Sequence, residues 1–338
     1  MILTNSLSGG GAETSALILQ EELAKIGHEV VLIGINSENP FSIKTTTNIF
    51  SLGREKTKPI STTVSSLLSF RKFLLTRRVD TLIVNCELPE FFALVSPRSI
   101  QLVIVEHANP SWYKRMFLGF IVRRTLAGRE PVLVTVGQHL KPRFLERFPY
   151  AHIPNPLCVV SEKDVVPITL DIKRLIYLGR LSPLFKNPLA VLVIAEGVNL
   201  PVLMIGDGAL MNELKSYAQN HQIDCKFTGF QTNPWELIES GDLVIIPSTA
   251  EGDGLTLVEA VQRGVPFLAS NIPDLNRYGI SASNYCSDLQ GFIDSINEFR
   301  HRLNELTVPR YISNKILEIR RPENVAKMWI KILFSTTK

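Results

Sequence analysis

Short runs of Val, Ile and Leu alternate with longer amphipathic stretches through both halves of this 338-residue chain. The short runs are typical of strands buried on both faces, and the stretches between them have the spacing of helices that cover such strands. The alternation predicts parallel sheets flanked by helices and argues against all-β and all-helical folds. Because a chain of this length can bury two cores, we expect two doubly wound, Rossmann-like α/β domains with a cleft between them.

The individual elements follow from this alternation. In the first half we expect strands near residues 2–4, 30–33, 81–86, 102–106 and 132–136, with helices beginning near residues 13, 64, 89, 111 and 138. In the second half we expect strands near residues 175–178, 202–205, 226–228, 243–246 and 266–269, each followed by a helix.

A run rich in proline predicts the domain boundary. Ile153-Pro154-Asn155-Pro156 is followed by the polar segment Ser161–Val166, which predicts domains over residues 1–158 and 159–321. Pro322 then opens an amphipathic segment, Glu323–Phe334, whose apolar stripe has to be buried. We treat residues 322–338 as a separate closing helix.

Composition narrows the class further. Hydrophobic residues make up 45% and charged residues 20% of the chain, which is typical of a folded globular protein. The sequence shows no apolar run long enough to span a membrane and no export signal, and its four cysteines are scattered singly. We therefore expect a cytoplasmic protein with free thiols.

Charge differs between the halves. Residues 1–158 carry 18 basic and 12 acidic side chains, whereas residues 159–338 carry 18 and 20. The positive first half suits an anionic acceptor or an acidic membrane surface, although dispersed solvated cations would give the same count. Within it, segment 111–127 interleaves aromatic residues with Lys and Arg. That helix would lie on an anionic membrane, face a lipid-linked acceptor, or be buried in the core. We expect no nucleic-acid partner.

The loops that follow the strands are where parallel sheets bind ligands. Ser8–Glu13 is rich in glycine and precedes a helix, so its backbone N–H groups would approach a phosphate closely. Thr14 stands where the dinucleotide fingerprint has its third glycine, which disfavours a nicotinamide oxidoreductase. A simple tight turn is the alternative for this loop.

Two loops of the second half carry the more informative pattern. Leu178–Asn187 contains Arg180 and Lys186, two cations suited to the charge that develops on a departing diphosphate, or else two surface cations. Pro247–Ala260 contains two carboxylates, Glu251 in a glycine-containing turn and Glu259 about a turn into the following helix. Carboxylates accept hydrogen bonds from vicinal hydroxyls, so this second loop would hold both ends of a nucleotide sugar.

One further candidate lies in the first half. His107 directly follows an expected strand, where it would hydrogen-bond a sugar hydroxyl or serve a structural role.

Taken in order, these motifs resemble the retaining glycosyltransferases of the GT-B fold, family 4. The resemblance covers nearly the whole chain, and its most specific part is the glutamate pair combined with the loop of Arg180 and Lys186. The motifs are Gly9-Gly10-Gly11-Ala12-Glu13, Gly27-His28-Glu29-Val30, Gly179-Arg180-Leu181, Lys186-Asn187, Gly206-Asp207-Gly208, Phe227-Thr228-Gly229, Glu251 and Glu259.

The resemblance implies a role for each candidate residue. Arg180 and Lys186 would bind the diphosphate, Glu251 the transferred sugar and Glu259 the ribose. His107 would reach toward the donor sugar, and the closing helix would pack back on the N-terminal domain. The other implied donor contacts are Gly10, Gly11, Gly229, Phe230, Asp253, Gly254, Leu255 and Thr256. Asp253 departs from the family, because many members carry an aromatic or apolar residue there, and Thr14 departs where a basic residue is frequent.

The implied activity is transfer of a hexose or N-acetylhexosamine, with retention, from a nucleotide-diphosphate sugar to a glycan or lipid-linked acceptor of cell-surface polysaccharide or lipopolysaccharide biosynthesis. We expect UDP as the nucleotide. The sequence contains no Asp-x-Asp pair, so we expect no metal and no other cofactor. A catalytically silent subunit that binds nucleotide sugars is the alternative.

Overall fold

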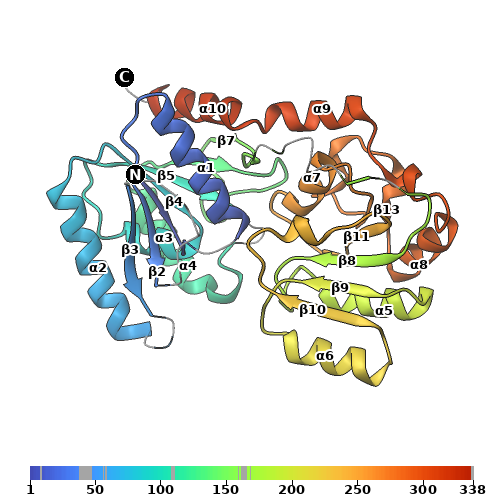
Figure 1. Ribbon diagram of the computed structural model, residues 1–338. Helices are drawn as coiled ribbons and strands as arrows, with labels where there is room; N and C mark the ends of the chain where they lie inside the picture. Colours follow the sequence, from blue (N-terminus) through green and yellow to red (C-terminus); the bar gives the residue numbers. More distant parts are fainter. Residues whose placement is uncertain are drawn as a thin grey trace. The chain divides into compact units, whose positions relative to one another are not determined.

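The computed structural model describes residues 1–7, 10–37, 48–55, 57, 59–107, 111–158, 160, 166–167 and 169–335. The chain divides into two compact units, one of Met1–Cys158 with Ile319–Lys338 and one of Val159–Glu318 (Figure 1). The first unit thus breaks at Cys158, where the sequence places the boundary, and resumes at Ile319, three residues before the expected closing segment. Gly9 and most of the expected linker, residues 161–165, lie outside the described residues.

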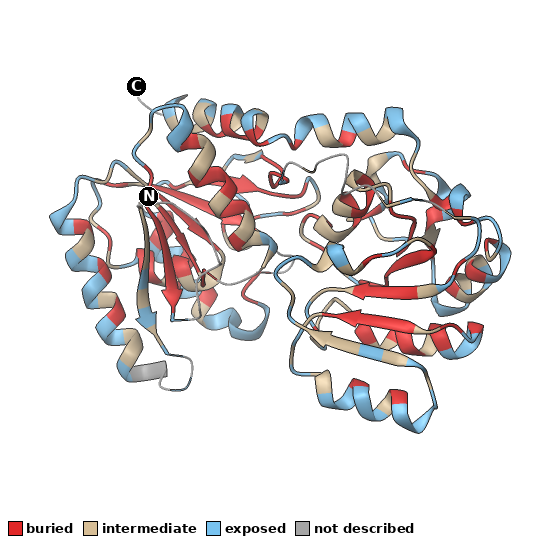
Figure 2. Ribbon diagram, in the orientation of Figure 1, coloured by how far each residue is buried: buried red, intermediate tan, exposed pale blue. Residues whose placement is uncertain are grey.

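The first unit is built on a parallel seven-stranded sheet of order β3-β2-β1-β4-β5-β6-β7. The central strands are buried almost without exception (Figure 2), as expected for strands that helices cover on both faces. The strands are β1 (Ile2–Thr4), β2 (Leu32–Asn36), β3 (Ile49–Arg54), β4 (Thr81–Asn85), β5 (Gln101–Glu106), β6 (Val132–Thr135) and β7 (Tyr150–His152).

Two separate hydrophobic clusters lie on the two faces of this sheet. One joins α2, α3 and α4, with Phe70 and Phe92 among its buried side chains. The other joins α1 and α10 through Leu19, Val325 and Trp329. The expectation that the last helix packs on the N-terminal domain is therefore confirmed. The helices of this unit are α1 (Gly11–Lys25), α2 (Pro59–Thr76), α3 (Glu87–Ala93), α4 (Met116–Ala127) and α10 (Pro322–Ser335).

The second unit has a parallel six-stranded sheet of order β10-β9-β8-β11-β12-β13. One large hydrophobic cluster of this unit includes Tyr177, Met204 and Phe292. Other residues, among them Ile176, Val258 and Phe267, are buried outside that cluster. The strands are β8 (Arg174–Leu178), β9 (Val202–Ile205), β10 (Cys225–Gly229), β11 (Asp242–Ile246), β12 (Phe267–Ser270) and β13 (Tyr285–Cys286). The helices are α5 (Pro188–Val198), α6 (Met211–Asn220), α7 (Leu255–Gln262), α8 (Leu289–Glu298) and α9 (Arg310–Ile319).

Three expected helices are wrong. The stretches after β10 and β12 contain only short 3-10 turns, which begin with Pro234–Leu237 and Asn276–Tyr278. The third expected helix is the one after β6. The stretch after Gln138 forms successive tight turns, in which the N–H groups of Leu140, Leu145 and Phe148 each donate to the carbonyl three residues earlier. Pro142 removes one backbone donor from this stretch, and Phe144 adopts a left-handed conformation at φ 64°. Both features are incompatible with a continuous helix.

Smaller differences concern one helix boundary and three edge strands. The helix expected from Ser111 begins only at Met116, after a 3-10 turn over Tyr113–Arg115. Strands β3, β7 and β13 were not expected, and each lies at or next to an edge of its sheet. Edge strands lack the continuous apolar runs by which buried strands are recognised. No disulfide joins the cysteines.

Candidate donor site

The second unit has a switch point where β8 and β11 lie side by side, since the strand order runs from β8 through β9 to β10 in one direction and from β11 to β13 in the other. Ligands of doubly wound sheets bind at the carboxyl ends of the strands at such a point. The two loops singled out in the sequence, after β8 and after β11, leave the sheet there. Parallel pairing of these strands places both loops at one edge.

Lys186 and Glu251 meet at this edge. The ammonium of Lys186 lies 2.7 and 2.9 Å from the two carboxylate oxygens of Glu251. Glu251 also accepts a hydrogen bond of 2.7 Å from the hydroxyl of Ser248, and its backbone N–H donates to Asp274 at 2.7 Å. The Glu251 side chain is buried, whereas that of Lys186 remains one-third exposed. Two residues 65 positions apart thus form one charged pair.

Two glycines hold the β8 loop in place. Gly206 and Gly208 have φ of 140° and 158°, and a Cβ at either would lie about 2 Å from the carbonyl oxygen of Gly179 or Leu181. Only glycine allows the backbone after β9 to approach the β8 loop this closely. The Leu181 N–H in turn donates to the carbonyl of Asp207 at 2.9 Å. The Gly206-Asp207-Gly208 motif therefore shapes the loop that carries Arg180 and Lys186.

Arg180 lies exposed on the same loop. Its carbonyl accepts a hydrogen bond of 2.9 Å from the hydroxyl of Tyr177, which fixes the backbone there. Within the described part of the chain, its guanidinium pairs with no carboxylate, so the structure does not bring it together with Glu251 as it does Lys186.

Glu259 lies one turn into α7, as expected, with its carboxylate held by a residue that the sequence did not single out. The indole N–H of Trp235 donates to Glu259 at 2.9 Å, and the guanidinium of Arg263 lies over the Trp235 ring, 4.8 Å from its centre. Burial raises the pKa of Glu259, while Trp235, Arg263 and Lys186 act in the opposite direction. The field of Lys186 thus acts on both candidate glutamates.

The start of α7 depends on Gly254. This residue caps the helix in the left-handed conformation, at φ 66°, and a Cβ there would lie 2.8 Å from the Leu275 side chain. Leu255 and Thr256 follow as the first helical residues, where backbone N–H groups lack partners within the helix. The Thr256 hydroxyl lies 3.5 Å from the carbonyl of Leu178, so α7 begins against the end of β8.

Asp253 has a different setting from the one expected of a donor contact. Its buried carboxylate pairs with the guanidinium of Arg277 at 2.8 Å, and its carbonyl accepts a hydrogen bond of 2.9 Å from the Tyr278 hydroxyl. The structure thus ties Asp253 to the segment after β12. Arg277 and Tyr278 were missed, because no local pattern marks a cation that pairs with an acid 24 residues away.

Gly229 and Phe230 end β10 next to β9. Gly229 has φ 71°, and its carbonyl accepts the N–H of Gly206 at 2.9 Å. The Phe230 side chain is half exposed. Because β10 and β9 are neighbours, this turn lies at the same edge of the sheet as the β8 and β11 loops.

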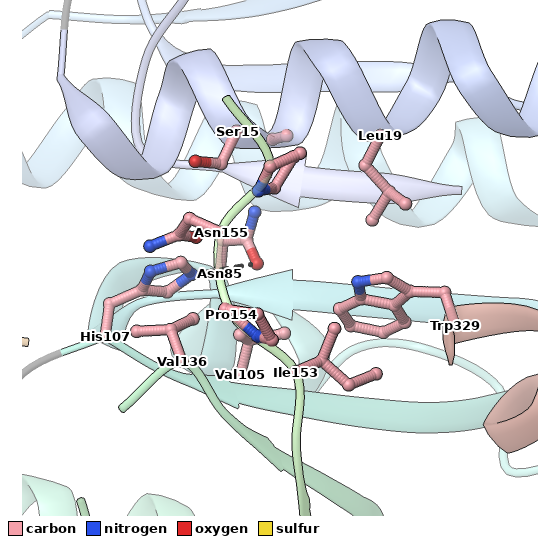
Figure 3. Close-up of a pocket in the computed structure, with 12 residues that line it drawn as sticks. Ser15, Leu19, Asn85, Val105, His107, Val136, Ile153, Pro154, Asn155 and Trp329 are labelled. Carbon is pink, nitrogen blue, oxygen red and sulfur yellow. Dashed lines mark hydrogen bonds between the residues drawn. The ribbon is translucent and has the colours of Figure 1, made fainter. Parts of the chain in front are cut away.

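The first unit contains a separate small pocket that includes His107, at the end of β5 (Figure 3). His107 Nε2 lies 3.3 Å from Oδ1 of Asn85, which ends the neighbouring strand β4. Ser15 and Asn155 complete the polar part, and Leu19 and Trp329 are among the apolar lining residues. His107 therefore lies among polar side chains beside α1.

Gly10 and Gly11 form the start of α1, with Gly10 as its extended N-cap. A Cβ on Gly10 would lie 2.2 Å from a carboxylate oxygen of Glu13. The glycine thus leaves room for an acid over the first turn, where a negative charge favours the helix.

Two Rossmann-like units, each a parallel doubly wound sheet with its loops gathered at one edge, define the GT-B class of glycosyltransferase folds. The Glycosyltransferase Family 4 model matches residues 9–160, and the Glycosyl transferases group 1 model matches residues 161–286. The chain belongs to this family of GT-B glycosyltransferases, as its motifs indicated.

Solved structures agree on the fold. Sucrose-phosphate synthase from Thermosynechococcus elongatus superposes with a TM-score of 0.75 at 16% identity, covering 99% of both chains. HepE from Anabaena, in complex with UDP and glucose, superposes with a TM-score of 0.74 at 14% identity, also over 99% of both chains.

The matches to curated relatives cover a smaller part of the chain. An Escherichia coli UDP-Gal:alpha-D-GlcNAc-diphosphoundecaprenol alpha-1,3-galactosyltransferase is 27% identical over 53% of this chain and 49% of its own. The lipopolysaccharide 1,6-galactosyltransferase of Escherichia coli is 26% identical over 41% of this chain and 44% of its own. The matched region spans about half the length of these relatives.

Proposed function

We propose that this chain transfers a hexose or N-acetylhexosamine, with retention of configuration, from a UDP-sugar to a glycan or lipid-linked acceptor. The reaction would serve cell-surface polysaccharide or lipopolysaccharide biosynthesis, in the cytoplasm and at the inner face of the membrane. The observation that carries this proposal is the Lys186–Glu251 pair at the β8–β11 switch point. Glu259 lies near enough that the charge of Lys186 acts to lower its pKa. One ligand bound there could contact a cation and two carboxylates.

The roles in this proposal follow from charge. Lys186 and Arg180 stabilise the diphosphate as it departs, and the start of α7 adds its partial positive charge. Glu251 accepts hydrogen bonds from the transferred sugar, and Glu259 from the ribose. Because Glu251 holds Lys186, a bound diphosphate would compete with this carboxylate for the ammonium.

The proposed retention follows a front-face route. No carboxylate in the donor loops stands clearly as a covalent nucleophile: Glu251 is paired with Lys186, and Asp253 with Arg277. The donor phosphate oxygen would take the proton of the acceptor hydroxyl as the bond from the sugar to the diphosphate breaks. The acceptor oxygen then bonds to the same face of the sugar, and UDP leaves.

The choice of donor and acceptor rests on the relatives. One transfers from UDP-Gal to an undecaprenol-linked sugar, a second is a lipopolysaccharide galactosyltransferase, and a third is the alpha-monoglucosyldiacylglycerol synthase of Streptococcus pneumoniae. All three names describe a sugar joined to a lipid, a lipid-linked sugar or lipopolysaccharide. The fold neighbour HepE was solved with UDP and glucose.

The test is turnover with labelled UDP-galactose, UDP-glucose and UDP-N-acetylglucosamine, with undecaprenyl-diphosphate-linked sugar as acceptor and product anomer determined by NMR. We expect one donor to be used with retention, and Lys186→Ala to lower kcat about a hundredfold. Lys215→Ala, which removes an exposed lysine of α6, is the matched control. Binding of UDP without transfer or donor hydrolysis would instead identify a silent subunit.

Metal independence is tested in the same assay. Because two side-chain cations are proposed to stabilise the diphosphate, we expect turnover in EDTA to equal turnover in Mg²⁺. Loss of activity in EDTA that a divalent metal restores would refute this part of the proposal.

A further inference from the structure

Helix α4 carries apolar side chains on two opposite faces. One face, with Val122 and Leu126, is buried in the cluster beside the sheet. The other face is exposed, and its side chains recur at intervals of three and four residues, which places them on one side of the helix. We call it the outer face; its members are Met116, Phe117, Phe120 and Ile121 of α4, together with Tyr113 of the preceding 3-10 turn, and Phe117 is 79% exposed and the others 44–52%.

The inner face is anchored so firmly that α4 cannot turn the outer face inward. Arg123, fully buried, binds the Glu90 carboxylate through two nitrogens at 2.8 and 2.6 Å, and lies 2.9 Å from Glu106. The Trp112 ring packs directly on Gly119 and donates its N–H to Glu90 at 3.1 Å. Separating the buried Arg123 guanidinium from these carboxylates would be strongly unfavourable. The outer face therefore stays exposed in the described structure.

Positive charge surrounds the outer face. Lys114, Arg115 and Arg124 are exposed on the same segment, and the sequence has no acidic residue between Glu106 and Glu130. The turns after β6 add to this charge, because the Phe144 ring packs edge-on against Phe120 at 5.7 Å and carries the Arg143 guanidinium over its own face at 5.0 Å.

We propose that the outer face of α4 docks on an anionic lipid bilayer. Its aromatic and aliphatic side chains enter the boundary between headgroups and acyl chains, and the surrounding Lys and Arg pair with lipid phosphates. None of the described helices is long and apolar enough to cross a membrane, so the contact is interfacial. A protein partner fits less well, because protein interfaces are depleted of lysine. A protein partner would also need an acidic surface complementary to these cations.

This inference names the surface at which the proposed transferase would meet a lipid-linked acceptor, and to that extent it rests on the proposed function. The docking itself needs neither donor nor acceptor. It is therefore measured in their absence, so that vesicle binding and sugar transfer can fail separately.

The experiment is flotation of the full chain with phosphatidylcholine vesicles that contain phosphatidylglycerol, compared with pure phosphatidylcholine, at low and high salt. We expect flotation with the anionic vesicles only, reduced at high salt because the lipid charge is screened. Replacing Lys114, Arg115 and Arg124 together by Ala should weaken binding about a hundredfold, at roughly fivefold per cation.

The apolar contribution is tested with Phe117→Ser, which should weaken binding about tenfold or more. Tyr311→Ser removes an equally exposed aromatic, 75% exposed on α9, and should leave binding unchanged. Circular dichroism and melting curves establish that every variant is folded. A wild-type chain that stays at the bottom with anionic vesicles, or Phe117→Ser that floats like Tyr311→Ser, overturns the proposal.

Discussion

At the scale of single residues, the partners of the candidate glutamates decide what each can do. Glu251 is held by Lys186 and Ser248, whereas Glu259 is held by the Trp235 indole. The hydrogen bonds from Ser248 and Trp235 therefore keep both acids positioned to accept hydrogen bonds from hydroxyl groups.

Trp235 is the residue whose replacement tests this arrangement. Trp235→Phe removes the N–H and keeps a ring beneath Arg263, and loss of one partner of a buried acceptor costs about 1–3 kcal/mol. If Glu259 binds the ribose, the KM for the UDP-sugar should rise about tenfold with kcat little changed. Steady-state kinetics with Trp112→Phe as control, which removes the indole donor to the buried Glu90, separate this from a general loss of stability. An unchanged KM would limit Trp235 to a structural role.

Glu106 should make the stability of the first unit depend on pH. Burial raises its pKa to about 7, against opposing effects of Arg123 and Ser111. The folded state then holds a proton that the unfolded state has released above its ordinary pKa of 4.5, so the free energy of unfolding falls as the pH rises from 4.5 to about 7.

The measurement is urea unfolding of wild type and Glu106→Gln across that range. The amide cannot ionise, so the variant should lack a decrease of up to about 3 kcal/mol that the wild type shows. Parallel pH profiles for the two proteins would show that Glu106 does not titrate in this way.

At the scale of elements, glycines determine where segments approach closely. Gly206 and Gly208 bring the β9 turn against the β8 loop, and Gly119 lets α4 receive the Trp112 ring. In the first case the glycine is required by both the backbone conformation and the space. In α4 only the space requires it, because the helix itself would favour alanine.

Gly119→Ala separates these two effects. A Cβ at this position would lie 2.4 Å from the Trp112 ring, which is held in turn by Glu90. We expect a net destabilisation of about 1–3 kcal/mol from overpacking, despite the gain in helix propensity. Gly128→Ala, where a Cβ meets only the Thr125 carbonyl at 3.5 Å, is the control and should be neutral or slightly stabilising. Equal melting temperatures for the two variants would contradict this reading.

At the scale of the whole molecule, each unit has its own core and its own edge of loops. The proposed donor contacts come mainly from the second unit. Nucleotide binding should therefore raise the free energy of unfolding of the second unit more than that of the first. The reason is that a ligand stabilises the folded state to which it binds.

Hydrogen exchange with and without UDP tests this distribution. We expect slower exchange in residues 179–187 and 248–259, and little change in α2. UDP-dependent protection spread evenly over both units, or confined to the first, would argue against a donor site at the β8–β11 switch point.

Sequence periodicity and loop chemistry determined the two parallel sheets, the closing helix and the family, because each is encoded in local runs of residues. The proximity of Lys186 and Glu251 was predictable for the same reason, since each lies in the loop that follows a recognisable buried strand. The short strands β3, β7 and β13 lack that signal, and Pro142 with Phe144 broke an expected helix.

Only the tertiary structure decided which distant side chains meet. Trp235 reaches Glu259, Arg277 holds Asp253, and Arg123 lies between Glu90 and Glu106. It also showed that α4, within segment 111–127, buries one apolar face and exposes the other. Such contacts depend on which strands and helices pack side by side. Local periodicity predicts the elements themselves but not which distant elements become neighbours.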